Sequence, residues 1–85
     1  MMEVSIVTPE TELFSGEASQ VYARSVEGEL GILPGHQPIL VALAEDAQVR
    51  VTDAGGAERA FDVSGGFLQF RDGRLTVLAD EGSGA

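Results

Sequence analysis

The sequence contains no cysteine, no tryptophan and no lysine, and it has a single histidine, His36. Without cysteine there can be no disulfide, no thiolate metal ligand and no cysteine nucleophile. One histidine also excludes a metal site built from several imidazoles. No apolar run reaches the length of about 18 residues that a membrane-spanning helix needs, and the first residues lack the pattern of a signal peptide. We therefore expect no direct insertion into a membrane.

Basic residues are scarce. Fourteen acidic residues face five arginines, which gives a net charge of −9. A surface this acidic repels phosphate, so we expect no nucleic-acid partner and no binding to anionic lipid headgroups. The length of 85 residues allows one domain, and the hydrophobic content of 44% is typical of a globular one. These features favour a protein of the cytosol or of the cytosolic face of a membrane.

Short runs of alternating apolar and polar residues, separated by glycine and proline, dominate the chain. They predict an all-β fold, an antiparallel β-sandwich or flattened barrel of about 8–10 short strands. We expect a turn at Ser15-Gly16, between two of these runs. Residues 1–80 are assigned to the sandwich domain, and residues 81–85 are expected to form a short flexible tail. The expected strands cover residues 2–8, 11–15, 17–26, 47–52, 58–63 and 74–79.

Several turns have specific residue signatures. Asp72-Gly73 between two runs predicts a type I′ hairpin. Pro34-Gly35 fits the central positions of a type II turn, because proline presets φ and glycine accepts a positive φ. Gly65 and Gly66 interrupt a strand pattern with no polar loop around them, which indicates a bulge or a corner where the chain crosses between sheets. We therefore assign structural roles to Pro34, Gly35, Gly65 and Gly66.

Residues 38–44 (PILVALA) are apolar in both phases of the alternation. One interpretation is a strand with both faces inside the domain. Another is that the face with Leu40 and Ala42 packs on a partner protein. A short helix beginning at Val41 is a third possibility, because alternation alone does not exclude it.

The candidate chemical groups do not form a reactive set. His36 stands beside the Pro34-Gly35 turn, without a G-x-S-x-G element or a motif that would supply an orienting partner. Glu27 and Glu29 provide too few oxygen ligands for calcium. No glycine motif resembles a phosphate-binding loop. We expect no catalytic residue, no metal site and no cofactor, so the residues alone predict an acidic, all-β interaction module.

Two segments carry a resemblance to a known family. The first is EGELGILPGHQPIL over residues 27–40. The second is VSGGFL over residues 63–68, followed by LTVLAD over residues 75–80, and Phe14-Ser15-Gly16 adds a third match. Together they resemble the epsilon subunit of the F-type ATP synthase, over about residues 3–80 in the same order.

The resemblance implies the amino-terminal β-sandwich domain of that subunit, a non-catalytic part of the central stalk. Such a domain binds the gamma subunit and the membrane rotor ring, and it helps couple proton flow to ATP synthesis. It would be peripheral on the cytosolic face of an energy-transducing membrane, here a bacterial cell membrane. Glu29 and His36 match family positions at the rotor-ring contact. For the gamma subunit we expect contact through Leu40 and Ala42.

The resemblance also shows a difference. Two helices that regulate ATP hydrolysis usually follow the TVLAD strand, and only residues 81–85 follow it here.

The alternative function is a free-standing cytosolic β-sandwich binding module without catalytic activity. A carbohydrate-binding version is disfavoured, because sugar platforms use exposed tryptophan and tyrosine and this chain has one tyrosine. A small hydrolase that uses His36 is a third hypothesis.

Overall fold

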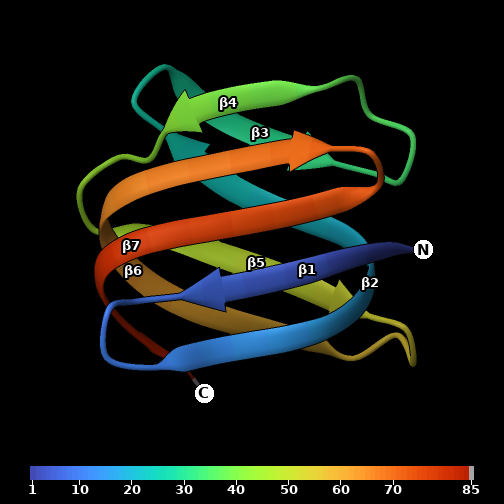
Figure 1. Cartoon of the computed structure of the whole chain (residues 1–85), viewed down its shortest axis with the longest axis horizontal. Coiled ribbons are helices and arrows are strands. Elements are labelled where there is room, and N and C mark those ends of the chain that lie inside the picture. Colours follow the sequence, from blue (N-terminus) through green and yellow to red (C-terminus); the bar gives the residue numbers. More distant parts are fainter. Residues whose placement is uncertain (85) are drawn as a thin grey trace.

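The computed structural model describes residues 1–84, in which seven strands and no helix are found (Figure 1). No helix of this part is therefore long and apolar enough to cross a membrane. The all-β prediction is confirmed. There are fewer strands than expected because β2 and β6 have 14 residues each and run through both layers of the molecule. The strands are β1 (Met2–Val7), β2 (Glu12–Ser25), β3 (Gly28–Ile32), β4 (Ile39–Ala42), β5 (Ala47–Asp53), β6 (Glu58–Arg71) and β7 (Arg74–Gly84).

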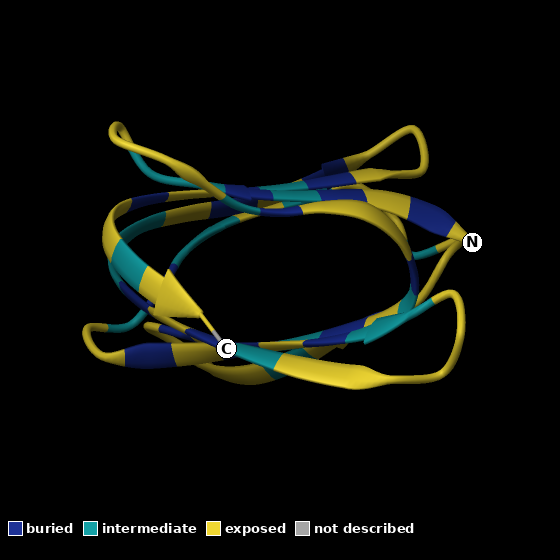
Figure 2. Cartoon of the chain, turned by 90° about the horizontal axis from the view of Figure 1, so that it is seen from below, coloured by how far each residue is buried: buried dark blue, intermediate teal, exposed yellow. Residues whose placement is uncertain are grey.

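The strands form a flattened barrel of two layers, joined at the sides by the long strands (Figure 2). The first sheet contains β4, the second half of β6, the first half of β7, β1 and the first half of β2. The second sheet contains the end of β7, the first half of β6, β5, the second half of β2 and β3. All pairs are antiparallel except β1–β7, which is parallel.

The core lies between the two sheets and consists of the residues in the inward phase of each strand. Phe61 and Ile6 are among its largest fully buried side chains, and Phe14 packs edge-on against Phe61 with ring centroids 5.8 Å apart. Outward residues of the same strands are exposed or half-buried, as the alternation predicts. The buried apolar residues are Met2, Val4, Ile6, Phe14, Ala18, Val21, Ala23, Ile32, Leu43, Ala47, Val49, Val51, Phe61, Val63, Leu68, Phe70, Leu75, Val77 and Ala79.

Gly65 and Gly66 form the corner at which β6 passes from one sheet to the other. Ser64 pairs with Glu81 and Gly66 with Ala79, so the register with β7 is unchanged across the corner and no residue is inserted. The φ angles are 63° at Gly65 and 146° at Gly66, a region that favours glycine. The feature is a corner and not a bulge.

The turns predicted at Asp72-Gly73 and Pro34-Gly35 are present. Asp72 and Gly73 have φ angles of 52° and 74°, as a type I′ hairpin requires. Gly35 has φ 98°, and the His36 amide donates to the Leu33 carbonyl at 2.9 Å, which closes the type II turn.

Two expectations about the strands are wrong. Ser15-Gly16 is not a turn, because Gly16 pairs with Val4 inside the continuous strand β2. Residues 81–84 are not an irregular tail but the last part of β7, paired with residues 61–64 of β6; Ala85 lies outside the described residues. Packing explains the difference: a Cβ on Gly82 would lie 2.8 Å from Leu13 Cδ1, and one on Gly84 would overlap the Phe61 ring. The glycines that suggested flexibility make room for core side chains.

Residues 38–44 contain the short strand β4 (Ile39–Ala42) and no helix. Ile39 and Val41 point inward and are partly buried against the core. Leu40 points outward and is 65% exposed. The interpretation with both faces inside the domain is therefore wrong, and the outward face of β4 remains open for a partner.

Candidate functional site

The outer face of the first sheet carries a continuous row of apolar side chains. In the sheet register Ala42 pairs with Phe67, Phe67 with Leu78, and Leu78 with Val7. The Val26 amide donates to the Ala42 carbonyl at 3.0 Å, which adds the β2–β3 hairpin to the same row. The row is about 19 Å long, at about 4.8 Å between neighbouring strands. We call Val26, Ala42, Phe67, Leu78 and Val7 the apolar row.

The large members of the apolar row are exposed. Phe67 and Leu78 each have 54% of their surface accessible, and Val26 has 65%. Single exposed apolar residues are ordinary on protein surfaces, but a contiguous set marks an interaction surface. The row therefore identifies a candidate docking site.

The row beside it is also uncharged, and it is polar except for Leu40. It runs from Leu40 through Gln69, Thr76 and Ser5 to Ser15, again by direct register pairs. The two rows together, which we call the docking face, carry no charge in a chain that has 14 acidic and 5 basic residues. A partner can cover this face without desolvating an ionised group, which is a major cost of burying charged surface.

Charges border the docking face at both ends. At one end Arg74 Nη2 lies 3.4 Å from Glu3 Oε2, an exposed ion pair. At the other end Asp80 follows the outward Leu78 on β7. The face is thus an uncharged surface with charged residues at its rim. Protein–protein interfaces commonly have such a polar rim around a less polar centre.

Both residues predicted to contact the gamma subunit lie on the docking face. Leu40 pairs with Gln69, and Ala42 pairs with Phe67. The local sequence pattern did not single out Phe67, Leu78, Val26 or Val7 as contact residues. A signal for Leu78 was available, because it occupies the outward phase of a strand in which Val77 and Ala79 point inward.

The two residues predicted at the ring contact are not brought together. Glu29 lies at the start of β3, where it pairs with Arg24 near the β2–β3 hairpin. His36 lies beyond the other end of β3, in the turn closed onto Leu33. The strand from Glu29 to Ile32 alone separates the two ends by about 10 Å. The two residues belong to opposite ends of the barrel.

His36 has the surroundings of a turn residue. Its Nδ1 lies 2.7 Å from the carbonyl oxygen of Gln37, and its ring packs edge-on against Phe70 with centroids 6.1 Å apart. Within residues 1–84 no carboxylate forms an ion pair with it.

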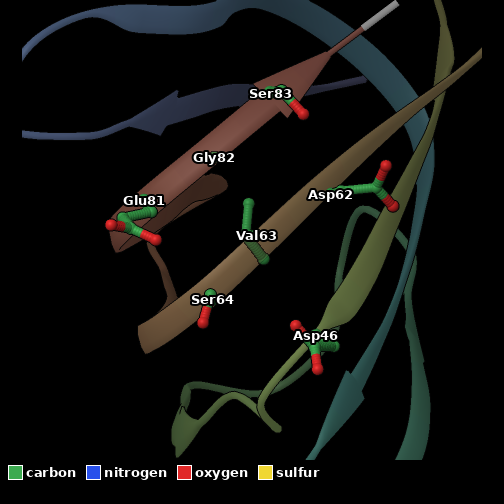
Figure 3. A pocket seen from close by; sticks show the side chains of 7 residues that line it. All are labelled: Asp46, Asp62, Val63, Ser64, Glu81, Gly82 and Ser83. Carbon is green, nitrogen blue, oxygen red and sulfur yellow. The ribbon is translucent and has the colours of Figure 1, made fainter.

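The other outer face, that of the second sheet, is polar. A hollow of about 410 Å³ lies there among residues of β6, β7 and the segment before β5, with three carboxylates on its walls (Figure 3). Asp62 and Ser83 are paired across β6 and β7, Glu81 also lies on β7, and Asp46 lies just before β5. In the described part of the chain no three acidic or histidine side chains come close enough to hold a metal ion.

Comparison with known sequences gives one consistent result. The family model described as ATP synthase, Delta/Epsilon chain, beta-sandwich domain matches residues 1–84. The ATP synthase epsilon chain of Brevibacillus brevis is 43% identical over 79 residues, which are 93% of this chain and 59% of that protein. The epsilon chain of Frankia casuarinae is 44% identical over 79 residues, which are 93% of this chain and 92% of that protein. This chain thus spans about three fifths of the first relative and nearly all of the second.

Comparison with solved structures agrees. A chain in the cryo-EM structure of the Euglena gracilis mitochondrial ATP synthase (OSCP/F1/c-ring) matches with a TM-score of 0.86 at 25% identity, over 95% of this chain and 51% of that one. A chain of the Tetrahymena thermophila mitochondrial ATP synthase central stalk and c-ring has a TM-score of 0.77 at 21% identity, over 96% of this chain and 65% of that one, and shows the shared fold alone. With the family model covering all the described residues, this chain belongs to the ATP synthase delta/epsilon chain family, as its β-sandwich domain.

Proposed function

We propose that this chain is the sandwich part of a central-stalk subunit of an F-type ATP synthase. It has no catalytic role in this proposal. It binds the gamma subunit and the membrane rotor ring, and so helps couple proton flow to ATP synthesis, on the cytosolic face of a bacterial cell membrane. The observation that carries the proposal is the docking face, an uncharged and partly apolar surface on an otherwise acidic domain of this family.

The docking face suits a large and stable partner such as gamma. Burial of apolar surface contributes about 25 cal/mol per Å², and moderate salt affects this contribution little. Phe67 and Leu78 stand at the centre of the row, where interface residues contribute most to binding. We therefore assign the gamma contact to this face, with Leu40 and Ala42 as part of it.

For the rotor ring we propose the end of the barrel that carries the β2–β3 hairpin. Its tip presents the exposed side chain of Val26, with Glu27 and Glu29 beside it. Because Val26 is also the last member of the apolar row, a contact there would adjoin the gamma contact. The carboxylates can pair with basic residues of the ring loops, and each such exposed pair contributes about 0–1 kcal/mol. His36, at the other end, is not part of this proposed contact.

The gamma contact is tested by a pair of matched leucine variants. Leu78 on the docking face and Leu33 beyond β3 have similar exposures, 54% and 57%. We expect Leu78→Asp to weaken the binding of purified gamma by at least about 100-fold, because the new carboxylate is buried without a partner. We expect Leu33→Asp to bind like the wild type. Titration calorimetry measures both affinities, and circular dichroism checks that both variants are folded.

Equal weakening by both leucine variants would mean that binding depends on general surface charge and not on the docking face. Normal binding by Leu78→Asp would exclude the face as the gamma contact. Because the position is already more than half exposed, the substitution removes little core packing. A folded variant that does not bind is therefore the expected result.

A further inference from the structure

A hollow opens alongside Phe67, Leu78 and Val7 of the apolar row, next to the corner of β6. Its volume is about 360 Å³, large enough for one long side chain of a partner. Most of its lining is apolar, and Asp80 is its only charged residue. The lining consists of Val7, Thr8, Pro9, Gly66, Phe67, Leu78, Ala79 and Asp80.

The carboxylate of Asp80 lies at the edge of this hollow, close to the glycine corner. Asp80 Oδ2 lies 2.7 Å from the position that a Cβ on Gly65 would occupy. A side chain at residue 65 would therefore push the carboxylate away. The corner glycines thus have a second consequence beyond the turn itself, because they let Asp80 lie over the backbone beside the docking face.

Asp80 has no cationic partner within residues 1–84. The two ion pairs in this part of the chain join Arg71 to Asp72 and Arg74 to Glu3, both at the opposite end of β7. A partner that covers the docking face will remove water from the hollow and from the carboxylate on its rim. An ionised carboxylate that loses water without gaining a partner destabilises a complex strongly.

We propose that the hollow receives an arginine side chain of the subunit that binds the docking face. The inference rests on the function proposed above and names the chemistry of its contact. The methylene stem packs between Leu78 and Pro9, as long basic side chains do along apolar surfaces. The guanidinium group then reaches the Asp80 carboxylate and the ring of Phe67, two partners that arginine binds well.

Arginine fits this hollow better than lysine. Its planar group can bind a carboxylate with two parallel hydrogen bonds and can stack on an aromatic ring, and it is more weakly hydrated than an ammonium group. The rest of the docking face is uncharged, so it gives little directional information. One charged pair at its edge would fix the orientation of the partner and reject partners without the basic residue.

The experiment measures gamma binding of Asp80→Asn at low and at moderate salt. Asparagine keeps the shape of the side chain and removes the charge. We expect affinity at low salt to fall about tenfold, and we expect the salt dependence of binding to decrease. The matched control is Asp62→Asn, an exposed carboxylate on the outer face of the second sheet, which should bind like the wild type at both salt concentrations.

A second variant tests the aromatic wall. Phe67→Leu keeps an apolar side chain in the row but removes the ring, and we expect binding to weaken about threefold. If Asp80→Asn does not fold, Asp80→Ser takes its place, because serine also removes the charge at this exposed position and should lower both the affinity at low salt and its salt dependence. Thermal unfolding of each free variant shows whether its fold is intact.

The outcomes separate this inference from the proposed function. If Asp80→Asn binds as tightly as the wild type at both salt concentrations while Leu78→Asp does not bind, gamma covers the docking face without an arginine in the hollow, and the inference is overturned. If Leu78→Asp binds normally as well, the docking face itself is wrong and both proposals fail. If Asp80→Asn binds more weakly than the wild type and Asp62→Asn does not, the inference is supported.

Discussion

Single glycines set the closest backbone approaches in this molecule. A Cβ on Gly66 would overlap the Leu78 carbonyl oxygen and would lie 2.7 Å from Ala79 Cα. Both contacts are with backbone atoms of β7, which cannot rotate away as a flexible side chain can. Both the lack of space for a Cβ at Gly66 and its φ of 146° therefore disfavour any residue with a side chain at this position.

This restriction leads to a stability prediction for Gly66→Val. We expect the free energy of unfolding to fall by about 1–3 kcal/mol, because the strand must shift or adopt a strained conformation. Urea denaturation measures the change.

Gly55→Ala is the matched control. Gly55 has no positive φ, and its nearest atom to an added Cβ is Asp53 Oδ1 at 3.5 Å, an ordinary contact. We expect a change within about 0.5 kcal/mol. Similar stabilities for the two variants would mean that the corner relaxes at no cost.

At the scale of strands, β7 takes part in both sheets and also contributes to the proposed binding site. Its first half pairs with both β1 and β6 in the first sheet, and its last residues cover Phe61 and Val63 in the second. The same strand contributes Leu78 to the docking face and Asp80 to the rim of the hollow. Core packing and the proposed binding site thus depend on one element.

We expect removal of residues 81–85 to destabilise the domain by about 2 kcal/mol. The truncation would remove the pairing partners of residues 61–64 and expose part of Phe61 and Val63 to water, and full exposure of such side chains costs about 1.5–3 kcal/mol each. Thermal or urea unfolding of the shortened chain tests this. An unchanged midpoint would show that the last part of β7 contributes nothing to the folded state in solution.

For the whole molecule the decisive feature is that the barrel has two distinct ends. It measures 26 × 25 × 19 Å, and the β2–β3 hairpin and the turn with His36 lie at opposite ends of β3. A flat partner such as a rotor ring can contact one end at a time. The sequence match placed Glu29 and His36 in one contact, and the barrel geometry separates them.

Single cysteines at positions 29 and 36 test the orientation in the assembled enzyme. We expect the cysteine in Glu29→Cys to cross-link to cysteines in the ring loops, and the cysteine in His36→Cys not to do so. The chain has no native cysteine, so each product has one origin. The reverse pattern would invert the domain on the ring and would assign the ring contact to the end with Pro34 and Gly35.

The all-β class, the turns at Asp72-Gly73 and Pro34-Gly35, and the family can all be predicted from the sequence. Alternation with a period of two and turn residues with a required φ act locally, so Asp72-Gly73 and Pro34-Gly35 can be identified without the fold. The same locality explains the errors at Gly16, Gly82 and Gly84. Glycine in a strand signals either a break or a close approach, and only the neighbour across the sheet decides which.

Which outward residues lie together depends on the pairing of strands and cannot be predicted from the sequence. Val26, Phe67 and Leu78 come from three separate segments, and the register of the first sheet alone makes them one row. It likewise places the corner glycines under Asp80 and sets Glu29 and His36 apart. These relations depend on pairings between residues far apart in the chain, and a local sequence pattern does not specify such pairings.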